Sequence, residues 1–285
     1  MVKLGCNTVG FRRLELEDAL ERVHRAGFHY VEVESNLCWC AHADPWNDDP
    51  AKFRATTEQF GFSGVSAVGS HREVISDPDA VPDLCQTIRW ASAAGIPIVI
   101  TGEGRCPEGM PEADALAVIR ERLTEILSVA EASHVVLAVE PHGTISLSPM
   151  GLARIMELAS SPWLRVNFDT ANPHRGDYVG TTRAGYEWKL DQSRRGDEVE
   201  VLQSVVHLVS HVHAKDVIGR RAVTLGAGEV DLRRCLKLLL SHGFEGVLSY
   251  ETEGEDPPEV TEQMMMNSRL YLERTLEEIG ARVSG

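Results

Sequence analysis

Short apolar runs alternate with amphipathic stretches along the whole chain. The apolar runs are nearly continuous, which is typical of parallel strands that are buried on both faces of a sheet. We therefore predict eight strands, at Lys3–Asn7, Tyr30–Glu34, Gly64–Val68, Pro97–Thr101, Val135–Glu140, Leu164–Asp169, Ser210–His213 and Gly246–Glu251.

Stretches with the spacing of an amphipathic helix lie between these runs. One apolar face runs through Glu15–Ala26. Another helix is predicted to begin at Ser148-Pro149, with Ser148 as the N-cap and Pro149 in the first helical position. The remaining clear helices are predicted at Glu112–Ala132, Asp231–Ser241 and Glu259–Ile279. Four glycines are predicted to end helices shortly before a strand begins: Gly27, Gly61, Gly95 and Gly243.

Eight strands that alternate with helices predict a single-domain (β/α)8 TIM barrel spanning residues 1–285, a length that suits this fold. An open, doubly wound sheet is the alternative, but no Gly-x-Gly-x-x-Gly motif follows the first strand. The long, charged segment Arg175–Glu198 is expected to be an elaborated loop after the sixth strand. Such a loop either shapes substrate access or is a solvated insertion.

Charge and composition limit the partners of the chain. The formal net charge is −15, which argues against nucleic acid as the main partner. No run approaches about 18 apolar residues, so no membrane span is expected. The chain begins without a secretory signal pattern, and we expect a cytoplasmic protein with reduced cysteines. The cluster Cys38, Cys40 and His42 lacks the spacing of a structural zinc site and is expected to be a loop.

Four strand candidates in the second half of the chain end in a metal-ligand type of side chain. These residues are Glu140, Asp169, His213 and Glu251. The C-terminal ends of barrel strands converge on one face, so the four side chains are predicted to meet. Three carboxylates would repel one another there without a cation. We therefore predict one divalent metal ion, with Mn²⁺ favoured by the donor set and Mg²⁺, Co²⁺ or Zn²⁺ as alternatives.

The same segments carry a family resemblance across nearly the whole chain. They are Gly27–Glu32, Glu140-Pro141-His142-Gly143, Asp169-Thr170-Ala171-Asn172, His213-Ala214-Lys215-Asp216, Leu225–Asp231 and Ser249-Tyr250-Glu251. Together they resemble the sugar phosphate isomerase/epimerase family of xylose isomerase-like TIM barrels, in the AP endonuclease 2 superfamily. The resemblance implies a metal and a small carbohydrate substrate, and it implies that Glu140 and Glu251 move the proton. It leaves the reaction open, because members include epimerases, isomerases, dehydratases and apurinic endonucleases.

Proton transfer next to a carbonyl fits such a site. A chelated metal stabilises the enediolate, and a carboxylate on the correct face acts as the base. Return of the proton to the opposite face gives epimerisation, return to the neighbouring carbon gives isomerisation, and loss of a β-hydroxyl gives dehydration. Isomerase or epimerase is our first hypothesis and a keto-inositol or keto-sugar dehydratase the alternative. A zinc endonuclease and a non-catalytic sugar-binding protein are disfavoured.

Other polar residues near the strand ends are candidate substrate contacts: His71, His142, Asn172, His174, Lys215 and Asp216. Glu103 is expected to be an ordinary loop residue, and His211 a wall or core residue below His213. Tagatose-type epimerases have a further glutamate where this chain has Ser146, so 3-epimerisation of free ketoses is disfavoured. The His-x-Lys-Asp form is closer to keto-polyol enzymes. The sequence leaves open whether the chain forms a homo-oligomer and whether the substrate is phosphorylated.

Overall fold

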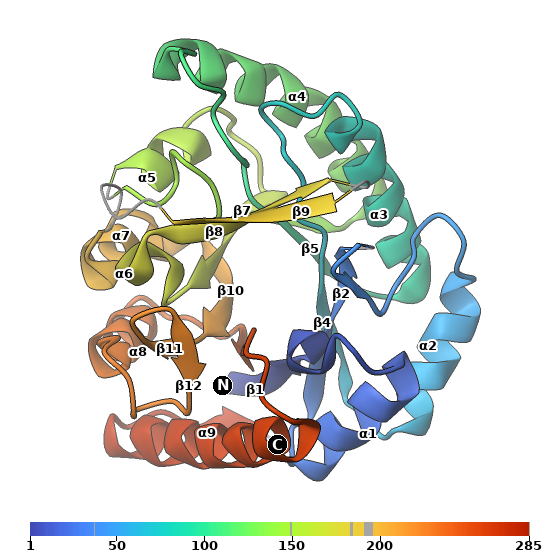
Figure 1. Ribbon diagram of the computed structural model, residues 1–285, viewed down its shortest axis with the longest axis vertical. Helices are drawn as coiled ribbons and strands as arrows, with labels where there is room; N and C mark the ends of the chain where they lie inside the picture. The colour runs from blue at the N-terminus through green and yellow to red at the C-terminus, as the bar shows by residue number, and fades with distance from the viewer. Residues whose placement is uncertain (37, 149, 183–184, 191–195, 285) are drawn as a thin grey trace.

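Eight parallel strands close into a barrel with helices around it (Figure 1). The computed structural model describes residues 1–36, 38–148, 150–182, 185–190 and 196–284. The barrel strands are β1 (Val2–Asn7), β2 (Tyr30–Asn36), β4 (Gly64–Gly69), β5 (Ile98–Thr101), β6 (Val136–Val139), β7 (Leu164–Asp169), β10 (Val209–Ala214) and β13 (Val247–Tyr250). Cys6 of β1 pairs with Val31 on one side and with Tyr250 on the other, which closes the sheet. The (β/α)8 prediction is confirmed, and the open doubly wound sheet is wrong.

The helices follow the strands in turn. They are α1 (Leu16–Arg25), α2 (Pro50–Gln59), α3 (Ala80–Ala94), α4 (Glu112–Ser133), α5 (Gly151–Met156), α6 (Asn172–Arg175), α7 (Glu198–Val205), α8 (Leu232–Ser241) and α9 (Pro258–Glu278), with 3-10 turns η1 (Thr8–Phe11) and η3 (Val206–Leu208). Among the described residues, no helix is long and apolar enough to cross a membrane. The short strands are β3 (Cys40–Ala41), β8 (Asp177–Thr182), β9 (Gly185–Leu190), β11 (Asp216–Ile218), β12 (Arg221–Val223) and β14 (Val283–Ser284).

Local chemistry explains most of the helix ends. The four glycines predicted as helix stops all have positive φ, and Gly95 at φ 80° is the left-handed C-cap of α3. The prediction for Ser148 is wrong, because Met150 is the N-cap of α5 and the Ser148 hydroxyl donates to the Ile145 carbonyl instead. Pro149, the other residue of that prediction, lies outside the described residues.

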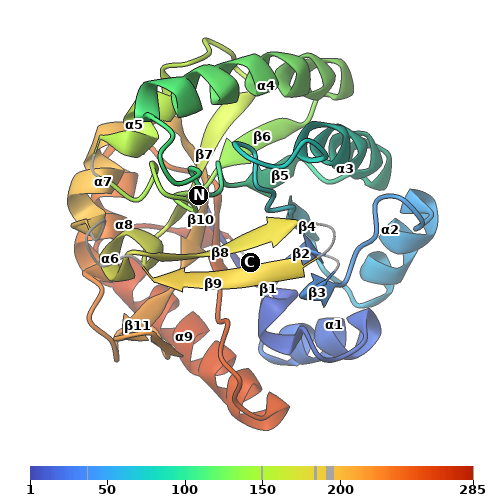
Figure 2. The same cartoon turned by 45° about the horizontal axis from the view of Figure 1, so that its top comes forward.

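The segment Arg175–Glu198, predicted to be a loop, contains the antiparallel hairpin β8–β9. The hairpin crosses the mouth of the barrel at the C-terminal ends of the strands (Figure 2). Its far end meets the loop after β2, where the Cys38 thiol donates to the Thr182 carbonyl at 3.5 Å and the rings of Trp39 and Tyr186 lie 6.1 Å apart. The insertion therefore covers part of the barrel mouth.

Candidate metal centre

The four predicted ligands come together at the C-terminal end of the barrel. Glu140 follows β6, Asp169 ends β7, His213 lies in β10 and Glu251 follows β13. His213 Nδ1 lies 3.3 Å from Glu140 Oε2, 3.9 Å from Asp169 Oδ2 and 3.5 Å from Glu251 Oε2. All four side chains are buried. One imidazole nitrogen thus faces three carboxylates in a space closed to solvent.

The donor atoms of this cluster lie close enough together to share one ion. Glu140, Asp169 and His213 each bring one ligand atom to within 4.8 Å of the others. Within the described part of the chain, His213 Nδ1 is buried without a hydrogen bond and faces the three carboxylates, of which Asp169 and Glu251 also contact the Lys215 ammonium group. Three oxygen donors and one nitrogen donor form a set that divalent cations accept. The residues therefore fit a divalent metal ion.

Lys215 brings a positive charge to the same place. Its Nζ lies 2.9 Å from Asp169 Oδ2 and 2.9 Å from Glu253 Oε2, and it also contacts Glu251 Oε2. Burial opposes the ammonium ion, but these carboxylates raise the pKa of Lys215 well above its ordinary value. Burial raises the pKa of Glu251 well above its usual range, although Lys215 and His213 oppose this shift. Lys215 therefore offsets part of the negative charge of the cluster.

Glu140 is held from three sides. It accepts hydrogen bonds from Asn167 at 3.0 Å and Asn172 at 2.8 Å, and His71 Nε2 lies 3.0 Å from its Oε2. Burial opposes ionisation of Glu140, but the imidazoles of His213 and His71 lower its pKa well below the ordinary value. The structure thus places Asn172 and His71, which were predicted as substrate contacts, against a candidate ligand.

His142 lies beside this group. Its ring packs against that of His71, with the centroids 4.3 Å apart and the planes tilted by 39°. Burial and the neighbouring His71 lower the pKa of His142 to about 3, so the ring is neutral near pH 7. A neutral imidazole can donate one hydrogen bond and accept another.

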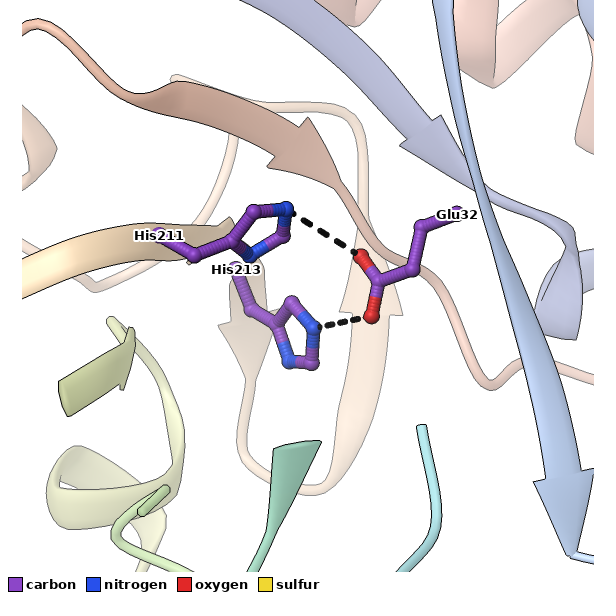
Figure 3. A group of neighbouring side chains, drawn as sticks. All are labelled: Glu32, His211 and His213. Atoms are coloured by element: carbon purple, nitrogen blue, oxygen red, sulfur yellow. Dashed lines mark hydrogen bonds and ion pairs between the residues drawn. The ribbon is translucent and has the colours of Figure 1, made fainter. Parts of the chain in front are cut away.

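Two further residues, His211 and Glu32, lie next to His213, and the Glu32 carboxylate faces both imidazole rings (Figure 3). Glu32 Oε1 on β2 is 2.8 Å from His213 Nε2, and Glu32 Oε2 is 3.9 Å from His211 Nε2. His211 is buried and also contacts Asn167 Oδ1 at 2.9 Å and Ser66 Oγ at 3.2 Å, which confirms it as a core residue. Since Glu32 holds Nε2 of His213, the opposite nitrogen, Nδ1, faces the carboxylate cluster.

A second layer also supports Glu251. The Asn7 amide donates to Glu251 Oε1 at 3.2 Å and to Glu34 Oε1 at 2.8 Å. The Asn36 amide donates to the other Glu34 oxygen at 2.5 Å. Burial raises the pKa of Glu34 to about 7. The sequence analysis did not predict Glu32, Glu34 or Glu253 as site residues. The signal for Glu32 and Glu34 is a pair of charged residues in an otherwise apolar strand. The signal for Glu253 is the Glu-x-Glu pattern that it forms with Glu251 after the eighth barrel strand.

The structure does not bring two of the predicted substrate contacts to the cluster. His174 Nδ1 lies 3.0 Å from Glu198 Oε2, at the junction of α6 and α7. Asp216 accepts hydrogen bonds from the backbone amides of Gly226 at 2.8 Å and Gly228 at 2.9 Å. Asp216 therefore holds the loop that precedes α8.

Two other groups from the sequence have structural roles. The carboxylate of Glu103 accepts hydrogen bonds from the Ser146 amide at 2.8 Å and the Ser146 hydroxyl at 2.6 Å, so it fixes the loop after β6. His42 contacts Thr8 Oγ1 at 2.8 Å and the Leu14 carbonyl at 3.0 Å through its two ring nitrogens. Cys38 is exposed, whereas Cys40 is buried in the short strand β3 with its Sγ 3.4 Å from His42 Nδ1, so the segment predicted to be a loop contains a strand.

Solved structures share this fold along almost the whole chain. A D-tagatose 3-epimerase-like protein matches with a TM-score of 0.76 and 18% identity, over 97% of this chain and 98% of that one. The IOLI protein with a bound zinc atom matches with a TM-score of 0.77 and 14% identity, over 98% and 100%. The probable 3-DHS dehydratase AsbF from Bacillus anthracis matches with a TM-score of 0.68 and 13% identity, over 92% and 97%. At these identities the likeness shows the fold alone.

No curated protein gives a significant sequence match to this chain. The model of one protein family, described as the xylose isomerase-like TIM barrel, matches residues 20–270. That range runs from α1 to α9 and includes every residue of the candidate metal centre. The chain belongs to the xylose isomerase-like TIM barrel family.

Proposed function

We propose that this chain is a divalent-metal-dependent isomerase or epimerase of a small sugar, keto-polyol or related hydroxy-carbonyl compound. One observation carries the proposal: three buried carboxylates, those of Glu140, Asp169 and Glu251, converge on His213 Nδ1 at the strand ends. Active sites of this fold lie at that end of the barrel. The D-tagatose 3-epimerase-like structure supports the reaction class, as far as a shared fold can.

The ion would be held by Glu140, Asp169, His213 and Glu251. Mn²⁺ is our first choice, and Mg²⁺, Co²⁺ and Zn²⁺ remain open. When bound, such an ion polarises a carbonyl group and offsets the negative charge that develops on an enediolate. The zinc atom in the IOLI structure is in keeping with a divalent ion in this fold.

The proton is moved by the chain's own carboxylates. We assign this role to Glu140 and Glu251, because they flank His213 from two different strands, β6 and β13. One, as the carboxylate, removes the proton from the carbon next to the carbonyl, and the other, as the carboxylic acid, donates its own proton to that carbon on the opposite face. Asn172 fixes the orientation of Glu140 and Asn7 that of Glu251, which keeps both groups in position for transfer. We assign to the neutral ring of His142 a hydrogen bond to a substrate oxygen.

A lyase that dehydrates a keto-inositol or keto-sugar is the second candidate. The observation that favours it is the ammonium group of Lys215, which lies in contact with Glu251 and within 2.9 Å of Asp169. A cation in that place would assist the departure of a β-hydroxyl as water. The two reactions are distinguished by product mass, since isomerisation conserves it and dehydration removes one water.

Elemental analysis of the purified protein tests the centre. We expect one divalent ion per chain, and a large loss of bound metal in Asp169→Ala and His213→Ala. His174→Ala is the matched control, because His174 also pairs with a carboxylate but lies away from the cluster. Equal metal content in all of these proteins would refute the assignment.

A further inference from the structure

Four arginines line one cavity of about 560 Å³ on the same face of the barrel: Arg12, Arg175, Arg220 and Arg221. They come from separate parts of the chain, namely the segment after η1, the end of α6, and the β11–β12 hairpin, where Arg220 lies in the turn and Arg221 begins β12. The segment 253–256, which follows β13, also lines the cavity. All of these segments follow C-terminal strand ends, as the candidate metal centre does.

One side chain links this cavity to the candidate metal centre. Glu253 lines the cavity, and its Oε2 lies 2.8 Å from Arg175 and 2.9 Å from Lys215. Lys215 in turn lies 2.9 Å from Asp169 and contacts Glu251. The cavity and the metal centre are therefore separated by one carboxylate and the lysine that it binds.

The charges in the cavity contrast with those of the whole protein. The chain has a formal net charge of −15, so its field repels anions in general. In the cavity, four guanidinium groups face three carboxylates, those of Glu253, Glu255 and Asp256. Lys215 lies behind Glu253, and its charge is shared with Asp169 and Glu251. By formal charge the lining therefore carries one more positive than negative group on an acidic molecule.

We propose that this cavity binds the anionic group, a carboxylate or a phosphate, of a substrate whose hydroxy-carbonyl end lies at the candidate metal centre. The proposal rests on the function proposed above and narrows its substrate to acidic compounds. Guanidinium groups suit this task because they bind carboxylate or phosphate oxygens with two parallel hydrogen bonds. Arg12 and Arg175 have side chains only 10% and 4% exposed, so the inner wall of the cavity is fixed by packing.

A purely structural role is the competing explanation. Arg221 lies 3.0 Å from Asp256, and Arg12 lies 3.8 Å from Glu255. If the arginines only neutralise segment 253–256, their removal lowers stability without changing which ligands bind. Ligand preference therefore separates the two explanations, whereas stability alone does not.

The test uses three ligands with one carbon skeleton: D-fructose, D-fructuronate and D-fructose 6-phosphate. They carry a hydroxyl, a carboxylate and a phosphate at the same end. Their affinities are measured by calorimetry at low ionic strength, with and without Mn²⁺, for the wild type and for Arg220→Ala/Arg221→Ala. Both of these arginines are exposed, so the double variant is expected to fold. The matched control is Arg233→Ala/Arg234→Ala, which removes two exposed arginines from α8.

We expect at least one anionic ligand to bind the wild type about tenfold or more tightly than D-fructose, because charge-assisted hydrogen bonds are the strong ones. The Arg220/Arg221 variant should lose most of this preference for the anionic ligand and keep its Mn²⁺ affinity. The control variant should keep both the preference and the Mn²⁺ affinity. Preference for D-fructuronate identifies a carboxylate, and preference for D-fructose 6-phosphate a phosphate. Absence of anion preference or of any binding, or a preference that survives in the variant, overturns the inference. Failure of the wild type to bind Mn²⁺ is a separate result that refutes the proposed function.

Discussion

Replacement of Glu32 by glutamine tests whether the residue below the candidate metal centre controls metal binding. Glu32 is fully buried, and its Oε1 lies 2.8 Å from His213 Nε2. Glutamine keeps the shape and an acceptor oxygen but removes the charge. The change therefore acts on the imidazole through a single hydrogen bond, without removing any of the four proposed ligands.

The size of the effect follows from the kind of hydrogen bond. A bond to a charged group contributes roughly 1.5–3 kcal/mol and a neutral one roughly 0.5–1.5 kcal/mol, so the loss is about 1–2 kcal/mol. Since 1.4 kcal/mol is a factor of about ten, the dissociation constant for Mn²⁺ should rise roughly five- to thirtyfold. This range overlaps the loss of metal affinity, roughly 10- to 100-fold, that is typical when the hydrogen-bond partner of a metal-binding histidine is removed.

The assay is a titration with Mn²⁺ in competition with a chromophoric chelator. It is made at about pH 8, because a metal ion that binds His213 must displace the proton of the imidazolium. Burial opposes the imidazolium, but the surrounding carboxylates, Glu251 first among them, raise the pKa of His213 well above its ordinary value. Glu198→Gln is the matched control, since Glu198 holds His174 at 3.0 Å in the same manner but away from the cluster. An unchanged Mn²⁺ affinity in Glu32→Gln, or an equal loss in the control, would refute the reasoning.

Three further predictions follow from the site and the fold. Glu140→Gln and Glu251→Gln keep an oxygen donor but remove the base, so turnover should fall by about 100-fold or more; full rescue by excess Mn²⁺ would show that neither is the base. Turnover in D₂O should place deuterium on the carbon next to the carbonyl, and NMR of the product detects it. If no deuterium is incorporated, and if a substrate deuterated at that carbon reacts no more slowly, the reaction proceeds by a hydride shift. Gly228→Ala should lower the free energy of unfolding in urea by about 1–3 kcal/mol, because the new Cβ would lie 2.1 Å from Asp216 Oδ1. Gly64→Ala is its control, since a Cβ there contacts only the Tyr30 ring, at 3.9 Å, and an equal loss of stability in it would contradict this explanation.

The sequence predicts the barrel well because its strands are buried on both faces. Each predicted strand overlaps an observed one, and Leu164–Asp169 matches β7 at both ends. The hairpin β8–β9 was missed as a strand pair because the segment is charged overall, although residues 186–190 alternate between apolar and charged types as a strand with one exposed face does. It folds against the barrel mouth through contacts such as Trp39–Tyr186, which no local pattern can predict.

The candidate ligands were predictable for a related reason, since a polar residue at the end of an apolar strand is conspicuous. The residues that support these ligands, such as Glu32 and Glu34, were not predictable. Glu32 and Glu34 lie within a strand, and only the stagger of the barrel places Glu32 under His213 and Glu34 beside Asn7. Lys215 and Asp216 are sequence neighbours, yet only Lys215 points to the carboxylates, because successive residues on an extended chain face opposite sides.

The hairpin and the arginine cavity occupy different parts of the barrel mouth. The tip of the hairpin meets the loops after β2 and β4, where Cys38 donates to Thr182 and Glu73 accepts from the Thr181 backbone. The cavity lies among the loops after β1, β7, β10 and β13. A ligand that reached from the cavity to the metal centre would pass Glu253 and Lys215. This arrangement favours a short compound with a different chemical group at each end.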